Sequence, residues 1–383
     1  MEGDFIKINK SLLPLSCLYG MGVCIRNFCF DVGILRSHSF DVPVISVGNI
    51  TVGGTGKTPH VEYLIRLLQN YMGDKRLPGN FQVAVLSRGY KRKTKGFLLA
   101  NEHTTAREIG DEPYQMKRKF PKVYVAVDRK RVRGIQRLTE EKRDTDVILL
   151  DDAFQHRYVT PGINILLVDY HRLVIYDRLL PAGRLREPLS GKDRADIVII
   201  TKCPKKLKPM DYRVVTKAMN LFPYQQLYFT MLDYEQPVPV FEGESLKTIE
   251  TLQSLKDTNV LLLTGIASPR QMIEDLKPYT DNITSLAFPD HHDFSEKDVE
   301  RINQTFATLP SPKCIITTEK DAVRIQNTTG LSIDVRQNIY ALPIRIRFIG
   351  KEKEELFNNH IIGYVRKNSR NSILAKSKDD NKS

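Results

Sequence analysis

The stretch 48–60, GNITVGGTGKTPH, decides the fold because it joins a short buried strand to a helix through a glycine-rich turn. The apolar run PVISV before it predicts the strand, and apolar residues after it recur at helical spacing. In such a turn Gly53, Gly54 and Gly56 can direct backbone N–H groups inward without a Cβ in the way, which forms a cradle for anionic oxygens. The positive end of the following helix favours the same ligand.

The residues that close the turn carry the side chains expected at a nucleotide site. Lys57 would reach the β- and γ-phosphates, and the Thr58 hydroxyl would complete a Mg²⁺ site shared with phosphate oxygens. The strict P-loop pattern has Gly where this chain has Thr51, but strand, glycine cluster, Lys-Thr pair and helix occur in the required order. We therefore predict a nucleotide-binding loop rather than an ordinary glycine-rich turn, formed by Thr51, Val52, Gly53, Gly54, Thr55, Gly56, Lys57 and Thr58.

A second hydrophobic strand, 147–152 (VILLDD), ends in two carboxylates. In a P-loop fold the strand beside the loop delivers an acid to the Mg²⁺ shell, so Asp151 and Asp152 are candidates for this Walker B position. A solvated strand end is the alternative, and the sequence leaves open which acid lies nearer the metal. In the segment IITKCP, Pro204 stands where GTPases of this architecture often have an Asp that recognises guanine. ATP is therefore favoured.

Continuous apolar runs separated by helix-length polar segments predict a parallel sheet covered on both faces. A second series of strands and helices follows a Pro-containing boundary near 236–255. The predicted fold is α/β, with a P-loop NTPase-like parallel sheet and a smaller α/β lobe. The expected domains are an N-terminal helix at 1–35, the P-loop core at 36–240, the second lobe at 250–365 and a flexible tail at 366–383.

The N-terminal run 12–25 (LLPLSCLYGMGVCI) is apolar all round and follows Lys7 and Lys10. It is shorter than the roughly 18 to 20 residues that span a bilayer. A signal peptide has a similar order of basic and apolar residues, but no cleavage motif of small residues follows here. We predict an interfacial helix in one leaflet rather than a helix packed on the core.

The chain has 58 Lys and Arg against 45 Asp and Glu, a formal net charge of +13. This balance predicts an anionic partner, which is a nucleic acid, a membrane surface or a phosphorylated substrate. Basic runs such as 117–119 and 129–131 are expected to be solvated faces. The five cysteines include no C-x-x-C pair, so a reducing cytoplasm fits better than a disulfide framework or a zinc site.

Three further polar segments leave alternatives open when they are judged from spacing alone. In IGDEP, Asp111 either caps the following helix or has a chemical role. In FPDHHDF, His291 and His292 are surface residues unless other evidence recruits them. In RLLPAGRLREP, Arg186 and Glu187 form a surface ion-pair cluster or bind phosphate and metal.

Taken together, these segments resemble the tetraacyldisaccharide 4'-kinase family of lipid A biosynthesis. The resemblance implies a peripheral kinase on the cytoplasmic face of the inner membrane, which moves the γ-phosphoryl group of ATP to the 4'-hydroxyl of an acylated glucosamine disaccharide 1-phosphate. The product would be the 1,4'-bisphosphate. The likeness rests on VGNITVGGTGKTP (47–59), LSRGY (86–90), GDEP (110–113), DDAFQHR (151–157), RLLPAGRLREP (178–188), LLTGIASP (262–269), FPDHHDF (288–294) and TTEKDAVR (317–324).

The resemblance also implies roles for single residues. Ala153 and the pair Arg184-Leu185 depart from the common family pattern, which affects loop shape and leaves the charged groups in place. The implied site has Asp111 as catalytic carboxylate, His291 as its partner, Lys57 and Thr58 in the P-loop, Asp151, Asp152 and Glu187 around Mg²⁺, and Arg186 near the phosphates or the metal.

Two other functions remain as alternatives. A GTPase of the metallochaperone type is disfavoured by Pro204 and by the absence of a Cys/His cluster in the sequence. A nucleic-acid-binding ATPase predicts steep salt dependence of binding. The kinase instead predicts association with anionic vesicles that is lost on deletion of residues 1–30, with no nucleic acid and no obligate protein partner.

Overall fold

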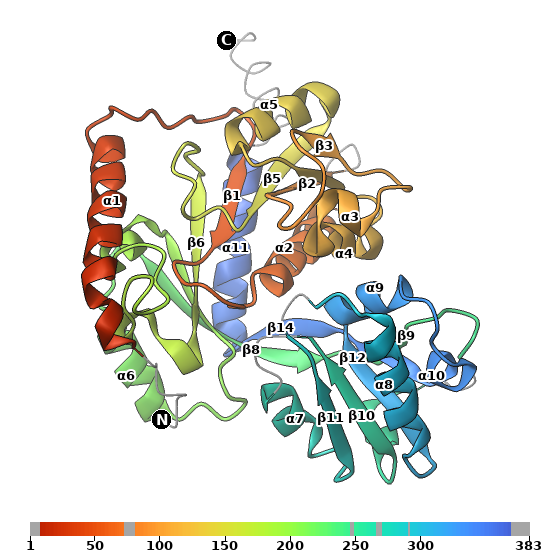
Figure 1. Ribbon diagram of the computed structural model, residues 1–383. Coiled ribbons are helices and arrows are strands. Elements are labelled where there is room, and N and C mark those ends of the chain that lie inside the picture. Colours follow the sequence, from red (N-terminus) through yellow and green to blue (C-terminus); the bar gives the residue numbers. More distant parts are fainter. Residues whose placement is uncertain (1–7, 73–80, 246–248, 266–269, 290–291, 369–383) are drawn as a thin grey trace. The chain divides into compact units, whose positions relative to one another are not determined.

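The computed structural model describes residues 8–72, 81–245, 249–265, 270–289 and 292–368, and the chain forms two compact units. The first unit contains Met1–Leu232 and Ile346–Ser383, and the second contains Asp233–Arg345 (Figure 1). Each unit has its own sheet, with strands that are mostly parallel. The α/β class predicted from the sequence is confirmed.

The first unit has a nine-stranded sheet in the order β14-β8-β7-β6-β1-β5-β2-β4-β3. Neighbouring strands run parallel from β8 to β4, and β3 is antiparallel to β4. The P-loop strand β1 is therefore flanked by β5, which carries the two predicted Walker B acids, and by β6. The strands are β1 (Val44–Gly48), β2 (Gln82–Ser87), β3 (Leu98–Leu99), β4 (Tyr124–Val127), β5 (Thr145–Asp151), β6 (Ile163–Asp169), β7 (Ile197–Thr201), β8 (Gln226–Tyr234) and β14 (Ile344–Phe348).

Helices cover both faces of this sheet because successive strand residues point to opposite sides. One set of strand side chains, with Ile45 and Leu149, packs against α2, α4 and α11. The alternate set packs against α5 at Ile148 and against α6 at Val198. The helices of this unit are α1 (Leu13–Asp31), α2 (Lys57–Met72), α3 (Ala106–Ile109), α4 (Asp111–Lys119), α5 (Arg131–Glu141), α6 (Pro209–Met219) and α11 (Lys351–Asn368).

The second unit has a five-stranded sheet in the order β11-β10-β12-β13-β9. The strands β11, β10, β12 and β13 are parallel, and β9 pairs antiparallel with β13. The elements are β9 (Val238–Pro239), β10 (Asn259–Thr264), α7 (Arg270–Leu276), β11 (Ile283–Ala287), α8 (Glu296–Ala307), β12 (Lys313–Thr318), α9 (Glu319–Gln326), α10 (Ile333–Gln337) and β13 (Ile339–Leu342).

The end of the chain returns to the first unit. We expected residues up to 365 in the second lobe, but β14 and α11 pack into the core of the first sheet through Phe348, Phe357 and Ile361. The sheet that a segment covers depends on long-range contacts, which local periodicity does not specify. Residues 366–368 belong to α11, and the rest of the predicted tail lies outside the described residues.

Candidate active site

The glycine-rich loop between β1 and α2 is joined to the RLLPAGRLREP segment by backbone hydrogen bonds. The N–H of Val52 donates to the carbonyl of Arg184 at 2.9 Å, and the N–H of Arg186 donates to the carbonyl of Ile50 at 2.8 Å. Thr51 and Leu185 form an antiparallel bridge. The start of the predicted nucleotide loop therefore fixes the backbone beside Arg186.

The loop also has internal ties that set its shape. Gly53 and Gly56 have φ angles of 116° and 84°, a region that a residue with a Cβ rarely adopts. The side-chain amide of Asn49 donates to Thr55 Oγ1 at 2.8 Å, and the Thr201 hydroxyl donates to the Thr55 carbonyl at 2.9 Å. Thr55 is thus held through both its side chain and its backbone, to the residue after β1 and to the end of β7.

Lys202, directly after β7, makes a contact with the loop that the sequence did not reveal. Its ammonium group donates to the carbonyl of Gly54 and forms an ion pair with Asp169 at 2.8 Å. The N–H of Thr55 belongs to the same planar peptide as this carbonyl and points the opposite way. The Lys202 contact therefore fixes the direction of one N–H group of the predicted phosphate cradle.

Two cationic side chains of the predicted site meet at Asp152, directly after β5. Lys57 Nζ lies 3.6 Å and the Arg186 guanidinium 3.4 Å from the same carboxylate oxygen, Oδ1. Burial alone would raise the pKa of Asp152, but Lys57 and Arg186 outweigh it and hold this pKa below its usual range. A phosphate group entering the loop would compete with Asp152 for the same two cations.

The environment of Asp151 shifts its pKa in the opposite direction from that of Asp152. It is 5% exposed, and its Oδ2 accepts a hydrogen bond from the Ser87 hydroxyl at 3.1 Å. Burial, followed by the negative charge of Asp152, raises the pKa of Asp151 to about 6. The two adjacent acids therefore differ physically: Asp151 is buried and hard to ionise, whereas Asp152 is partly exposed and paired with cations.

Two carboxylate oxygens without hydrogen-bond donors among the described residues show that the chemistry of this site suits a cation. Asp151 Oδ1 and Glu187 Oε1 are buried and accept no hydrogen bond from the described part of the chain. The other Glu187 oxygen accepts from Arg194 at 2.7 Å. No group of three His, Cys, Asp or Glu side chains is close enough to hold a metal ion in the described ranges. Mg²⁺ is commonly held by one or two protein carboxylates together with phosphate oxygens and water, so two orphaned hard oxygens fit it without such a cluster.

Asp111 is the first residue of α4, and Gly110 occupies the N-cap position. The capping alternative for Asp111 is therefore wrong. Gly110 has a φ of 95°, and a Cβ there would lie 2.9 Å from the Tyr90 carbonyl oxygen, so the backbone before Asp111 requires glycine. The next residue, Glu112, raises the pKa of Asp151 through its negative charge, which brings the start of α4 within electrostatic range of the Walker B acids.

The predicted partner His291 lies outside the described residues. Its neighbour His292 has a local structural contact, because His292 Nε2 lies 2.9 Å from Asp298 Oδ2 at the start of α8. His292 also stacks on Phe288, with 5.0 Å between the ring centroids. The FPDHHDF segment belongs to the second unit, whereas the other predicted site residues belong to the first.

A family model for tetraacyldisaccharide-1-P 4'-kinase (LpxK) matches residues 8–362. The chain belongs to this family. The tetraacyldisaccharide 4'-kinase of Phocaeicola vulgatus is 57% identical over 375 residues, which cover 97% of this chain and 99% of that protein. The tetraacyldisaccharide 4'-kinase of Bacteroides thetaiotaomicron is 53% identical over 390 aligned residues that cover all of both chains.

A solved structure agrees with this assignment. LpxK from Aquifex aeolicus, crystallised in complex with ATP, is 31% identical and superposes with a TM-score of 0.67. The match covers 92% of this chain and 98% of that one. The family predicted from the motifs is confirmed, and a P-loop kinase fold is shared across nearly the whole chain.

One residue of this family member was assigned wrongly from sequence. The run 129–131 was expected to be a solvated basic face, but Arg131 is 2% exposed. Its guanidinium donates to the carbonyl of Asp128 at 2.6 Å and to that of Asp151 at 3.0 Å. Burial lowers the pKa of Arg131 to about 10. Helical spacing carried the missing signal, because Arg131 lies on the same face of α5 as the buried Ile135 and Leu138.

Proposed function

We propose that this chain is an ATP-dependent kinase that phosphorylates the 4'-hydroxyl of tetraacyldisaccharide 1-phosphate and gives the 1,4'-bisphosphate in lipid A biosynthesis. The observation that carries the proposal is the meeting of Lys57, Arg186 and Asp152 beside the glycine-rich loop. This constellation occurs in a chain that matches the kinase family from residue 8 to residue 362. Its charges suit a triphosphate rather than a neutral ligand.

In the proposed complex the phosphates of ATP lie along the N–H groups of residues 51–58. Lys57, which pairs with Asp152 at 3.6 Å, and Arg186, which donates hydrogen bonds to it at 3.4 Å, turn to phosphate oxygens when the nucleotide binds. Their positive charge stabilises the negative charge that spreads over the transferred phosphoryl group. Asp152, relieved of the two cations, is then available to the Mg²⁺ site.

Mg²⁺ would be held by Thr58, Asp151, Asp152 and Glu187, of which Asp151 and Glu187 have buried oxygens without donors in the described chain. When bound, the ion would neutralise part of the negative charge of the phosphate groups. Its charge would also favour the ionised form of Asp151, whose pKa burial raises in the metal-free protein.

Asp111 is proposed as the base that accepts the proton of the sugar hydroxyl, with His291 as its partner. The 4'-oxygen attacks the γ-phosphorus while the bond to the bridging β–γ oxygen breaks, and ADP leaves with the electron pair of that bond. The hydroxyl proton moves to the Asp111 carboxylate. Support for Asp111 comes from the position of α4, whose first turn lies in electrostatic range of Asp151.

The acceptor carries acyl chains, and α1 offers a surface for a lipid leaflet. The segment Lys10–Asp31 is long and apolar enough to cross a membrane by length and composition, but one of its sides is held by the protein. We propose that it lies in the interface at the cytoplasmic face of the inner membrane, where each nearby Lys or Arg adds about 1 kcal/mol. Its exposed apolar side chains include Leu15, Leu18, Met21, Ile25 and Phe28.

The proposal is tested with purified protein, labelled ATP and the disaccharide 1-phosphate in detergent, followed by mapping of the hydroxyl that gains phosphate. We expect transfer to the 4' position that depends on Mg²⁺ and prefers ATP to GTP. Phosphate on another hydroxyl, or hydrolysis of ATP without transfer, would contradict it. Loss of binding to anionic vesicles on deletion of residues 1–30 tests the membrane assignment separately.

A further inference from the structure

The side of α1 that faces the protein begins with the small residues Ser16 and Gly20 and ends with the buried Phe30. Ser16, Gly20, Val23, Asn27 and Phe30 follow one another at three- or four-residue intervals, which puts them on one stripe of the helix. Ser16 and Gly20 are buried, and a Cβ on Gly20 would lie 2.8 Å from a methyl carbon of Leu179. The helix therefore approaches the protein body closely along this stripe.

Through the first half of this side, α1 binds the RLLPAGRLREP segment. The Ser16 hydroxyl donates to the carbonyl of Leu179 at 3.0 Å and accepts from the N–H of Ala182 at 2.9 Å. One turn later, the Tyr19 hydroxyl donates to the carbonyl of Arg186 at 2.7 Å. The helix thus holds the backbone of the residue that pairs with Asp152.

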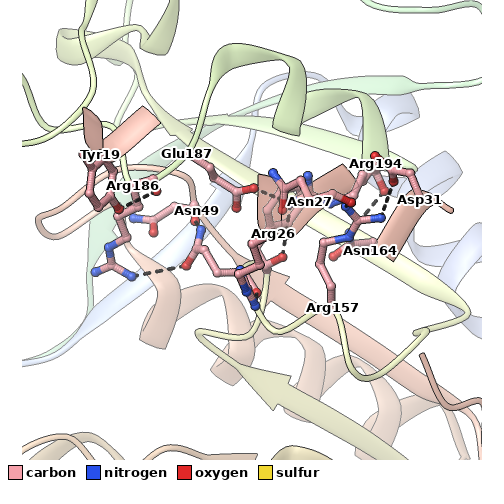
Figure 2. A network of polar contacts seen from close by, with 12 residues as sticks. Tyr19, Arg26, Asn27, Asp31, Asn49, Arg157, Asn164, Arg186, Glu187 and Arg194 are labelled. Atoms are coloured by element: carbon pink, nitrogen blue, oxygen red, sulfur yellow. Dashed lines mark hydrogen bonds and ion pairs between the residues drawn. The ribbon is translucent and has the colours of Figure 1, made fainter. Parts of the chain in front are cut away.

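The second half of α1 binds the DDAFQHR segment. The Arg26 guanidinium donates to the carbonyl of Gln155 at 2.9 Å. In return, the Arg157 guanidinium donates to the carbonyl of Asn27 at 3.0 Å and forms an ion pair with Asp31 at 2.6 Å. Figure 2 shows these side chains of α1 and the body reaching toward one another.

The two carbonyls that α1 holds belong to residues whose side chains meet. Arg186 donates to Gln155 Oε1 at 3.4 Å and lies 3.4 Å from Asp152 Oδ1. The amide of Gln155 in turn donates to the carbonyl of Asn49 at the start of the nucleotide loop. One helix therefore holds the backbones of Arg186 and Gln155, two of the three residues in the Arg186–Gln155–Asp152 cluster.

We propose that Tyr19 and Arg26 are positioning residues, through which α1 orients Arg186 toward the phosphates of the bound nucleotide. The proposal rests on the function proposed above, in which Arg186 stabilises the transferred phosphoryl group. Tyr19 and Arg26 touch no reacting atom; they act by restricting the backbone of Arg186 and Gln155. A helix that contacts the lipid surface with one side thereby forms part of the frame of the nucleotide site with the other.

The test is the Tyr19→Phe variant of the full chain, which removes one hydroxyl and keeps the ring. We expect kcat in detergent to fall about three- to tenfold, the range expected for one lost hydrogen bond to a positioned group. KM for ATP, binding to anionic vesicles and the unfolding temperature should stay close to wild type. The Arg26→Gln variant should also have a lower kcat than wild type.

The matched control is Tyr124→Phe. Tyr124 also uses its hydroxyl in one hydrogen bond, to Asp144 at 2.8 Å, but it lies at the first residue of β4 and away from the carboxyl ends of the strands. This variant should keep wild-type kcat. A fall in kcat equal to that of Tyr19→Phe would show a general effect of losing a tyrosine hydroxyl and would overturn the proposal.

A double-variant cycle separates positioning from a merely structural effect. In an Arg186→Gln background, Tyr19→Phe should lower kcat by less than twofold, because the group that it positions is already absent. A full three- to tenfold effect in that background would overturn the proposal. An Arg186→Gln variant with wild-type kcat would contradict the function proposed for Arg186. If Arg186→Gln lowered kcat but Tyr19→Phe did not, the function of Arg186 would stand and the positioning role of Tyr19 would be overturned.

Discussion

Both units place acidic side chains at the carboxyl edge of a parallel sheet, but the acids differ in how far their oxygens are satisfied by hydrogen bonds within the protein. In the first unit, Asp151 has a buried oxygen without a donor in the described chain, and Asp152 is paired with two cations. In the second unit, Asp321 accepts from the N–H of Gly265 at 2.8 Å and from the Thr318 hydroxyl at 2.7 Å through one oxygen. Its other oxygen accepts from Arg324 at 3.4 Å.

We propose that this difference separates a ligand site in the first unit from a structural tie in the second. A buried carboxylate whose hydrogen bonds are made within the protein stabilises the loop that supplies them, as Asp321 does between β10 and α9. A buried carboxylate with an unused oxygen costs free energy until a ligand satisfies it. We therefore propose that the same residue type has different functions at the edges of the two sheets, and the hydrogen bonds made by each acid are the basis of that proposal.

The largest expected effect concerns the proposed base. Asp111→Asn keeps the shape of the side chain and removes its ability to take a proton, so kcat should fall by about 10²- to 10⁴-fold. Binding of ATP, measured by calorimetry, should remain near wild type. Turnover close to wild type would remove Asp111 from the base role.

Removal of a phosphate-binding cation comes next. Lys57→Ala should cost at least about 3 kcal/mol of transition-state stabilisation, by analogy with the loss of a key charge-stabilising donor. Arg324→Ala is the matched loss of a cation that pairs with an acid in the second unit, and it should weaken ATP binding far less. Equal losses of ATP affinity in the two variants would contradict the contrast between the two edges.

The structural tie is tested by Asp321→Ala. The change leaves the Gly265 N–H and the buried Arg324 without this acceptor, so the free energy of unfolding should fall by about 3 kcal/mol. ATP affinity in the first unit should be nearly unchanged when measured well below the unfolding temperature. A stable variant that loses ATP binding would show instead that Asp321 belongs to the ligand site.

The smallest expected effect is a pH dependence of stability in the ligand-free protein. Since the folded state raises the pKa of Asp151 to about 6, it binds this proton more tightly than the unfolded chain does. The stability contributed by this proton is present below about pH 4 and is lost as the pH rises through 4 to 6, by roughly 2 to 3 kcal/mol. Asp151→Asn should therefore be less pH-sensitive and more stable than wild type at pH 7. Parallel stability curves for the two proteins would exclude this assignment.

Local sequence patterns predicted the parts of the site that depend on neighbouring residues. The glycine loop, Lys57 and the acids after a buried strand are contiguous signals, and the structure places Lys57 within ion-pair distance of Asp152. Lys202 and Gln155 were missed because their contacts join segments far apart in the chain: Lys202 reaches Gly54 and Gln155 reaches Asn49. Spacing identifies a strand end but not which backbone carbonyl the next side chain will bind.

The same limit applies to the fold. The continuous apolar runs, separated by helix-length polar segments, correctly predicted a parallel sheet covered on both faces, because each buried strand shows its own run. The return of β14 and α11 to the first core depends on contacts that Phe348 and Phe357 make with the first sheet. Strand β14 begins more than a hundred residues after β8, which is the nearest preceding strand of that sheet in sequence. Helical spacing is the same whichever sheet a helix covers.

The second unit, Asp233–Arg345, is an insertion between two neighbouring strands of the first sheet, β8 and β14. During translation the ribosome therefore completes the inserted unit before it has made the last strand and helix of the unit that begins the chain. Emergence of Phe357 and Ile361 completes the core that the first sheet shares with α2. A nascent chain thus cannot complete the core of its first unit until the whole inserted unit has been synthesised, which makes folding of the first unit wait for the second.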